Sequence, residues 1–67
     1  MSHLTTRELE ILGLVAAGRT NGQIAQQLCV TEQTVKFHVA NLLRKLHVAN
    51  RAEAVARYLA LLGMRAP

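Results

Sequence analysis

The strongest constraint on the fold is a series of helix-start signals along a short chain. Thr5–Glu8, Thr20–Gln23 and Asn50–Glu53 have the spacing of a capping box, in which the first and fourth residues cap each other's backbone. Thr31 supplies a further start signal after the two-residue break Cys29–Val30. The connections are short and no strand pattern is present. The sequence therefore predicts an all-α, four-helix fold, with helices at about 6–17, 21–28, 32–46 and 51–62.

Apolar residues recur at helical spacing within these segments, so each segment has a predicted core-facing side. The chain has 67 residues, of which 51% are hydrophobic, and we expect one domain over 1–67. The predicted core positions of the first, second and third helices are Leu9, Leu12, Val15 and Ala16, then Ile24, Ala25 and Leu28, then Val35, Val39, Leu42, Leu43 and Leu46.

The third predicted helix is polar and basic on the side opposite its apolar stripe. Its exposed arc carries cations and amides, and its acid, Glu32, stands at the helix start. Phe37 lies about 170° from the centre of the stripe on a helical wheel, so we expect an exposed ring. The net charge is +4, which suits a nucleic acid but also fits a surplus that merely confers solubility. The face of this helix favours duplex DNA as the partner.

Catalytic and metal-binding patterns are absent from the sequence. The chain has no Asp, its Glu residues stand mostly at helix starts, and no glycine-rich phosphate loop is present. Cys29, His38 and His47 lack a metal-ligand spacing. We therefore predict that the chain is not an enzyme, and we expect no cofactor and no metal.

The sequence also carries no membrane signal. The longest apolar run, Ile11–Ala17, falls far short of the ~20 residues that span a bilayer. A single cysteine fits a reducing compartment. We expect a soluble cytoplasmic protein without a membrane partner.

The short second helix, the tight turn and the longer third helix predict a helix-turn-helix, whose second helix enters the major groove. The fourth helix is apolar over too broad an arc for one core. Its second flank, Ala54, Tyr58 and Leu61, is the predicted homodimer interface. The alternative is that the first helix packs on that flank.

Separate parts of the chain together resemble the LuxR-type helix-turn-helix domain. The resemblance covers nearly all of Leu4 to Gly63 and rests on Leu4–Glu8, Gly18, Asn21, Ile24–Ala25, Leu28, Thr31–Glu32, Thr34–Lys36, His38–Val39, Leu42, Lys45–Leu46 and Asn50–Ala54. It implies a third helix that reads DNA and a fourth that contributes to a dimer on two half-sites. It also implies the output domain of a bacterial transcription regulator, such as a quorum-sensing receptor or a response regulator. We expect such a domain to act at the nucleoid, with RNA polymerase as a further candidate partner.

The resemblance also assigns roles within the third helix. Lys36, Phe37 and Ala40 match positions that reach bases, although some members of the family carry a long cation at the position of Ala40. Ala40 and Phe37 offer apolar contact, for example to a thymine methyl group. This pair predicts a surface less directed to guanine than an Arg- or Lys-rich helix would be.

Other positions match phosphate contacts or residues that hold the motif together, and Arg51 is as well suited to bonding nearby carbonyls as to DNA. Gln33 and Asn41 have amides suited to adenine, though such amides are often simply solvated. Lys45 has the alternative of staying at the core edge. The predicted DNA-contacting set is Asn21, Thr31, Gln33, Thr34, Lys36, Phe37, His38, Ala40, Asn41, Arg44, Lys45 and Arg51.

Two other classes of partner give competing interpretations. A helical protein-interaction module would use the basic helix against an acidic protein surface, and a preference for particular duplex sequences would distinguish DNA binding from it. RNA binding is disfavoured because the only aromatic residues are Phe37 and Tyr58, which leaves little for base stacking.

Overall fold

The computed structural model describes residues 4–63, which form four α-helices. They are α1 (Thr6–Ala16), α2 (Asn21–Leu28), α3 (Glu32–Lys45) and α4 (Arg51–Leu61). The predicted all-α fold is confirmed. Three helices end one residue earlier than predicted, because Ala17, Leu46 and Leu62 occupy the C-cap position.

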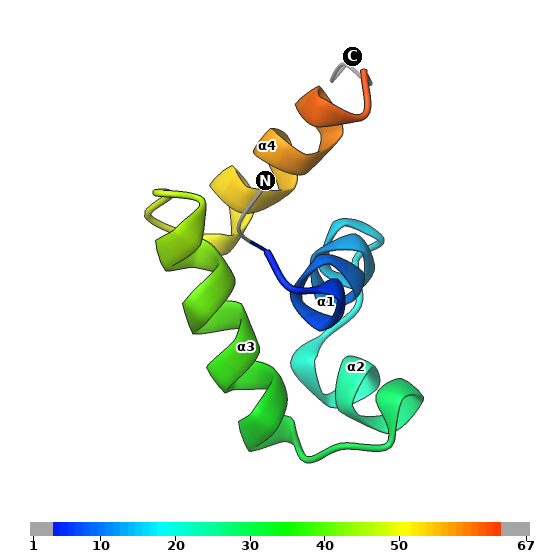
Figure 1. Cartoon of the computed structure of the whole chain (residues 1–67). Helices are drawn as coiled ribbons and strands as arrows, with labels where there is room; N and C mark the ends of the chain where they lie inside the picture. Colours follow the sequence, from blue (N-terminus) through cyan, green and yellow to red (C-terminus); the bar gives the residue numbers. More distant parts are fainter. Residues whose placement is uncertain (1–3, 64–67) are drawn as a thin grey trace.

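The helices are arranged around α1 (Figure 1). α3 runs along one side of the molecule, and both α1 and α2 pack against it, while α4 packs on α1. Between α2 and α3 the chain reverses in a tight turn. Cys29 adopts a left-handed conformation there, with φ of 57°, and the Val30 N–H donates to the Ala25 carbonyl at 3.0 Å. The predicted helix-turn-helix is therefore present.

Two of the three predicted capping boxes form in full, those of Thr5 with Glu8 and Thr20 with Gln23. The third forms only in part. Asn50 Oδ1 accepts from the Glu53 N–H at 2.9 Å, but Glu53 Oε1 accepts from the Ala49 N–H at 3.2 Å. The carboxylate thus bonds one residue further back than a capping box requires, and the prediction is wrong in that half.

The core lies between the four helices. The buried apolar residues are Ile11, Leu12, Val15, Ile24, Ala25, Val35, Val39, Leu42, Leu46 and Ala54. One predicted core position is wrong, since Leu9 is 44% exposed. The buried side of α1 instead begins at Glu8, which is 3% exposed, and continues through Ile11 and Leu12. A stripe drawn from hydrophobic residues alone misses this register, because an acid occupies its first position.

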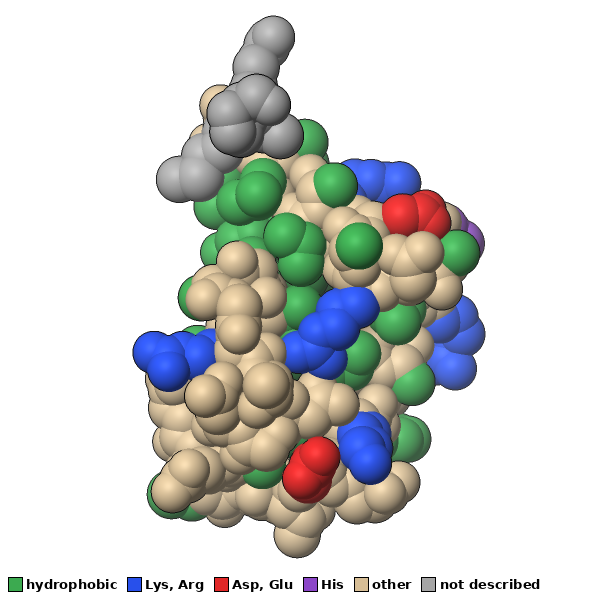
Figure 2. All heavy atoms as spheres, turned by 180° about the vertical axis from the view of Figure 1, so that it is seen from behind, with side chains coloured by type: hydrophobic (Ala, Val, Ile, Leu, Met, Phe, Trp, Pro, Cys, Tyr) green, Lys and Arg blue, Asp and Glu red, His purple; other side chains and the backbone are tan. Residues whose placement is uncertain are grey.

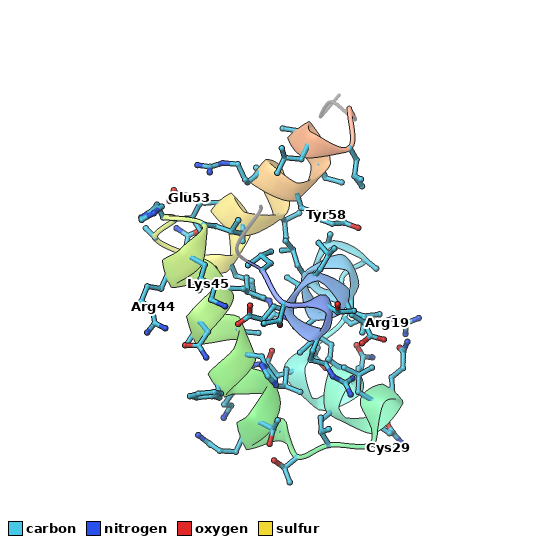
Figure 3. All side chains as sticks on the ribbon, in the orientation of Figure 1. Arg19, Cys29, Arg44, Lys45, Glu53 and Tyr58 are labelled. Carbon is cyan, nitrogen blue, oxygen red and sulfur yellow. The ribbon has the colours of Figure 1, made fainter. Side chains whose placement is uncertain are left out.

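The predicted dimer flank of α4 requires a correction. Ala54 is 1% exposed and belongs to the core, because α1 packs on this flank. Tyr58 lies between α4 and α1 (Figure 3), and a Cβ placed on Gly13 would lie 3.3 Å from its hydroxyl oxygen. Glycine at this position therefore lets the two helices approach closely. Of the three predicted interface residues, Leu61 is the exposed one, at 54%.

Candidate nucleic-acid interface

The outward face of α3 consists of Gln33, Lys36, Phe37, Ala40 and Arg44, all of them exposed. Their positions follow from the helical period, because burying Val35, Val39 and Leu42 turns residues about half a circle away toward solvent. Lys and Arg side chains, separated by hydrophobic ones, lie on the right side of Figure 2, where α3 runs. A cationic helix face without acids beyond its first turn suits a polyanion.

The start of this helix is fixed by two threonines. Thr31 Oγ1 accepts from the Thr34 N–H at 3.1 Å, which confirms Thr31 as the N-cap. The two hydroxyl oxygens are 2.8 Å apart and hydrogen-bonded to each other. Both side chains thereby hold the first turn of α3, where a helix-turn-helix meets DNA.

Phe37 and His38 stand side by side on α3. The Phe37 side chain is 63% exposed, and its ring lies edge-to-face with the imidazole, with centroids 6.0 Å apart and an interplanar angle of 63°. His38 is half-buried, and within residues 4–63 its buried Nδ1 has no hydrogen-bond partner. The imidazole thus supports the ring of Phe37 at the border between the core and the outward face.

Arg44 and Asn41 interact with each other on the last turns of α3. Arg44 Nη2 donates to Asn41 Oδ1 at 2.8 Å, and Arg44 extends away from the body of the domain (Figure 3). A bidentate amide contact to adenine needs that carbonyl oxygen as an acceptor. In this arrangement Asn41 supports Arg44, and its oxygen already accepts one hydrogen bond within the chain.

Lys45 turns inward, toward α1 (Figure 3). Its Nζ donates to Glu8 Oε1 at 2.7 Å, and the same oxygen accepts from the Thr5 N–H at 2.9 Å. The hydrogen bond from the Lys45 ammonium, helped by that from Thr5, holds the pKa of the Glu8 carboxyl below its ordinary value. This is the core-edge alternative for Lys45. We therefore do not carry Lys45 into the proposed DNA-contacting set.

Arg51 also has partners within the chain. Its Nη1 donates to Asn21 Oδ1 at 2.6 Å and its Nη2 donates to the Arg19 carbonyl at 2.8 Å. The guanidinium thereby joins the start of α4 to the start of α2 and to the loop before it. Of the two roles considered for Arg51, bonding to nearby backbone is the one that the structure supports. Asn21 takes part in the same junction through its carbonyl oxygen.

Three contacts between helices and loops cannot be predicted from local sequence, because each joins residues that are distant in the chain. They are the pair Glu8–Lys45, the junction of Arg51, and the hydrogen bond from Arg57 Nη1 to the Leu46 carbonyl at 3.2 Å. One signal existed for the first of them. Glu8 precedes Ile11 and Leu12 by three and four residues, which places its carboxylate on the buried stripe, where it needs a partner.

Two classes of site are missing from the described part of the chain. Within residues 4–63, no group of three His, Cys, Asp or Glu side chains is placed to hold a metal ion. No helix in the same range combines the length and the apolar character that crossing a bilayer requires.

Fold and site together define a helix-turn-helix domain of the DNA-binding type. The amino-acid sequence matches the family described as bacterial regulatory proteins, luxR family, over residues 2–58. The chain belongs to this family, which confirms the resemblance. It is a DNA-binding regulatory domain and not an enzyme.

Several transcription regulators are similar to the chain. It is 52% identical over 60 residues to the HTH-type quorum sensing-dependent transcriptional regulator RpaR of Rhodopseudomonas palustris. This match covers 90% of the chain and 25% of RpaR. It is 53% identical over 51 residues to the transcriptional regulatory protein LiaR of Bacillus subtilis, covering 76% of the chain and 24% of LiaR. A match of 52% over 54 residues to the HTH-type transcriptional regulator MalT of Vibrio campbellii covers 81% of the chain and 6% of MalT. The chain thus spans a quarter or less of these relatives.

Proposed function

We propose that the 67 residues form one output domain of a bacterial transcription regulator, which binds specific double-stranded DNA with α3 in the major groove. The observation that carries this proposal is the outward face of α3, where exposed Lys36 and Arg44 flank an exposed ring. Packing within the domain does not require polar and basic side chains on the outward face of α3. The regulator would act in the bacterial cytoplasm, at the nucleoid.

The contacts divide into base-reading and phosphate-binding groups. Gln33, Lys36, Phe37 and Ala40 would face base edges, while Arg44 and the half-buried His38 would reach phosphates. Thr31, Thr34, Asn21 and Asn41 would act at the rim of the interface, where each also has a partner within the chain. Arg51 acts as a positioning residue. RNA polymerase remains a candidate partner, and we assign no residue to it.

The decisive experiment is selection of short duplexes from a random pool, with sequencing of the retained fraction and a salt titration of binding. We expect log Kd to depend on log salt with a slope of several phosphate equivalents, and a repeated or palindromic motif to be enriched. A similar slope without any enriched motif would contradict sequence-specific binding. It would favour the competing interpretation, a basic module that meets an acidic partner.

Lys36→Ala tests the assigned face of α3 directly. We expect affinity for the selected duplex to fall by about tenfold, with unchanged helix content, because Lys36 is exposed. Arg7→Ala is the matched control, since it removes the same charge from α1, where Arg7 pairs with Glu10 at 3.3 Å. Equal losses in the two variants would mean that net charge alone governs binding.

We also infer a homodimer through α4, on a different side from the one predicted from sequence. Ala52, Ala56 and Ala60 are exposed and Leu59 is half-buried, on the side of α4 that faces away from Ala54. Hydrophobic side chains gather over α4 in the upper part of Figure 2. Leu62, which is 53% exposed, extends this apolar surface toward the helix end. An uncovered apolar helix face supports a second copy as its partner.

Ala56→Glu would place a charge in the middle of this surface. We expect sedimentation to show fewer dimers, free or on a two-site duplex, while binding of a single half-site persists. Ala17→Glu introduces the same change at the exposed end of α1 and should leave the dimer intact. A wild-type chain that is monomeric both free and on DNA would contradict the interface.

A further inference from the structure

The outward face of α3 contains an apolar pair within otherwise polar surroundings. Phe37 and Ala40 are three residues apart, so their side chains are neighbours on the helix surface. The Phe37 ring is 63% exposed, and Ala40 is exposed beside it. The other large exposed hydrophobic residues lie on α1 and at the end of α4, so Phe37 does not belong to a larger apolar patch. Packing within the chain does not explain the pair.

The surroundings of the pair show what could cover it. The Phe37 ring lies edge-to-face with the His38 imidazole, so the apolar surface borders on a second ring. Lys36 precedes the ring, and Arg44 follows Ala40 by one helical turn. Cations on both sides of Phe37 and Ala40 indicate that the partner carries phosphates around the group that contacts this pair. A partner that is anionic at its rim and apolar at its centre is required.

Few side chains on this face are available to form hydrogen bonds to base edges. Asn41 Oδ1 is occupied by Arg44, and the Thr31 and Thr34 hydroxyls bond each other. On the outward face, Gln33 and Lys36 are the polar side chains of the first turns of α3 that make no hydrogen bond to another residue of the range 4–63. A half-site read by this helix therefore depends on apolar contact to a larger extent than one read through arginine and asparagine.

The major groove offers one apolar group, the methyl on C5 of thymine, and 5-methylcytosine carries the same group. We propose that Phe37 and Ala40 form a contact site for a pyrimidine 5-methyl group, so that each half-site contains a thymine facing α3. This inference rests on the proposed function, because it requires α3 in the major groove. Burying one methyl group corresponds to about fourfold in Kd.

The test uses the motif selected by the 67-residue chain. Each thymine of one half-site is replaced in turn by deoxyuridine, which removes only the methyl group, and Kd is measured by fluorescence anisotropy. We expect about fourfold weaker binding at one or two positions and no change elsewhere. At a responsive position, the T·A pair is also replaced by C·G and by 5-methyl-C·G. Tighter binding of the methylated cytosine would identify the methyl group rather than the hydrogen-bonding pattern.

Two variants connect the effect to the residues. Phe37→Ala should reduce the thymine-to-uracil ratio of Kd from about four to about one, and Phe37→Leu should retain most of it. Lys36→Ala is the control, which weakens binding to both duplexes and leaves the ratio unchanged. Because Phe37 is exposed, circular dichroism should show folded variants.

The outcomes separate this inference from the proposed function. Specific binding without any thymine that responds to loss of its methyl group overturns the methyl site and leaves the proposed function intact. A response that persists unchanged in Phe37→Ala also overturns the site. A chain that prefers no duplex over another overturns the proposed function, and the inference falls with it.

Discussion

Arg44 and Lys45 are neighbours at the end of α3, carry the same charge, and belong to two different faces of the helix. Lys45 reaches inward to the buried Glu8 at 2.7 Å, whereas Arg44 extends outward and donates a hydrogen bond to Asn41 of the same helix. The Lys45 side chain is 30% exposed and the Glu8 side chain 4%. The inner face thus uses a cation to satisfy a buried acid, and the outer face leaves a cation free for a partner.

The cause of this difference is the helical period. One residue along α3 turns a side chain by ~100°, enough to move it from the junction with α1 to solvent. Charge counted along the sequence therefore overstates the surface offered to DNA. Lys45 and Arg51 stabilise helix junctions, so Lys36 and Arg44 are the basic residues that α3 contributes to the outward face.

The largest effect on stability is expected when a side chain on the inner face of α3 is truncated, compared with a truncation on its outer face. Leu42→Ala removes a side chain that is 1% exposed and should lower the free energy of unfolding by about 3 kcal/mol. Phe37→Ala removes a larger side chain from the outer face and should change it by less than about 0.5 kcal/mol. Urea unfolding measures both. A large loss in Phe37→Ala would mean that the ring belongs to the core.

Lys45→Met and Arg44→Met compare the neighbouring cations directly. Lys45→Met leaves the Glu8 carboxylate buried without its cation and should lower the free energy of unfolding by about 2 kcal/mol. Arg44→Met should leave stability within about 0.5 kcal/mol and reduce the salt slope of DNA binding by about one.

The double variant Glu8→Gln/Lys45→Met is the control for Lys45. Gln retains the capping acceptor without the charge, so this variant should recover part of the lost stability. If Arg44→Met were the more destabilising of the two single variants, the assignment of the two faces would be reversed.

Acid should weaken the inner face selectively. The pKa of Glu8 lies below its ordinary value in the folded chain, so its ionised form stabilises the fold above the unfolded pKa of about 4.3. This contribution is lost as the pH falls through the lowered pKa. We expect the urea midpoint to be nearly constant from pH 7 to 5 and to fall toward pH 3.

Two variants test the origin of the acid effect. Glu8→Gln should start from a lower midpoint and decline less between pH 5 and 3, because the group that titrates is gone. Glu10→Gln, on the exposed side of α1, should retain the wild-type decline. Equal declines in Glu8→Gln and the wild-type chain would exclude Glu8 as the source.

The sequence was sufficient to predict the fold because the signals that define it are local. Threonines at the helix starts, glycines with positive φ at Gly18 and Gly63, and apolar residues at helical spacing act within one or two turns. Two local predictions were wrong for a common reason. The buried stripe of α1 and the exposed flank of α4 were both assigned from hydrophobicity alone. In α1 this fails because Glu8, an acid, occupies a core position. In α4, alanines cover so broad an arc that hydrophobicity does not single out Ala54.

The candidate site was only partly predictable, because its composition depends on which polar groups are already paired. Exposure of Phe37 followed from the helical wheel. The partners of Lys45 and Arg51 lie 37 and 30 residues away in sequence. The position of Glu8 on the buried stripe indicates that it needs a partner, but no local pattern identifies Lys45 as that partner or predicts the junction of Arg51. The resemblance placed Arg51 and Asn21 among residues that contact phosphate or hold the motif together. The hydrogen bond from Arg51 Nη1 to Asn21 Oδ1 in the structure favours the second of these roles, holding the motif together.

Arg51→Lys should destabilise the fold less than Leu42→Ala or Lys45→Met, and it tests this second role. The guanidinium bonds Asn21 and the Arg19 carbonyl at once, whereas an ammonium on a shorter stem cannot reproduce that fork. We expect a loss of about 1 kcal/mol in the free energy of unfolding and an unchanged salt slope, since the charge is kept. Asn21→Ala should lose a similar amount, and the double variant should lose less than the sum, because both changes remove the same hydrogen bond. Strictly additive losses would contradict the shared hydrogen bond between Arg51 and Asn21. A reduced salt slope in Arg51→Lys would instead place Arg51 on the DNA, with the outward cations.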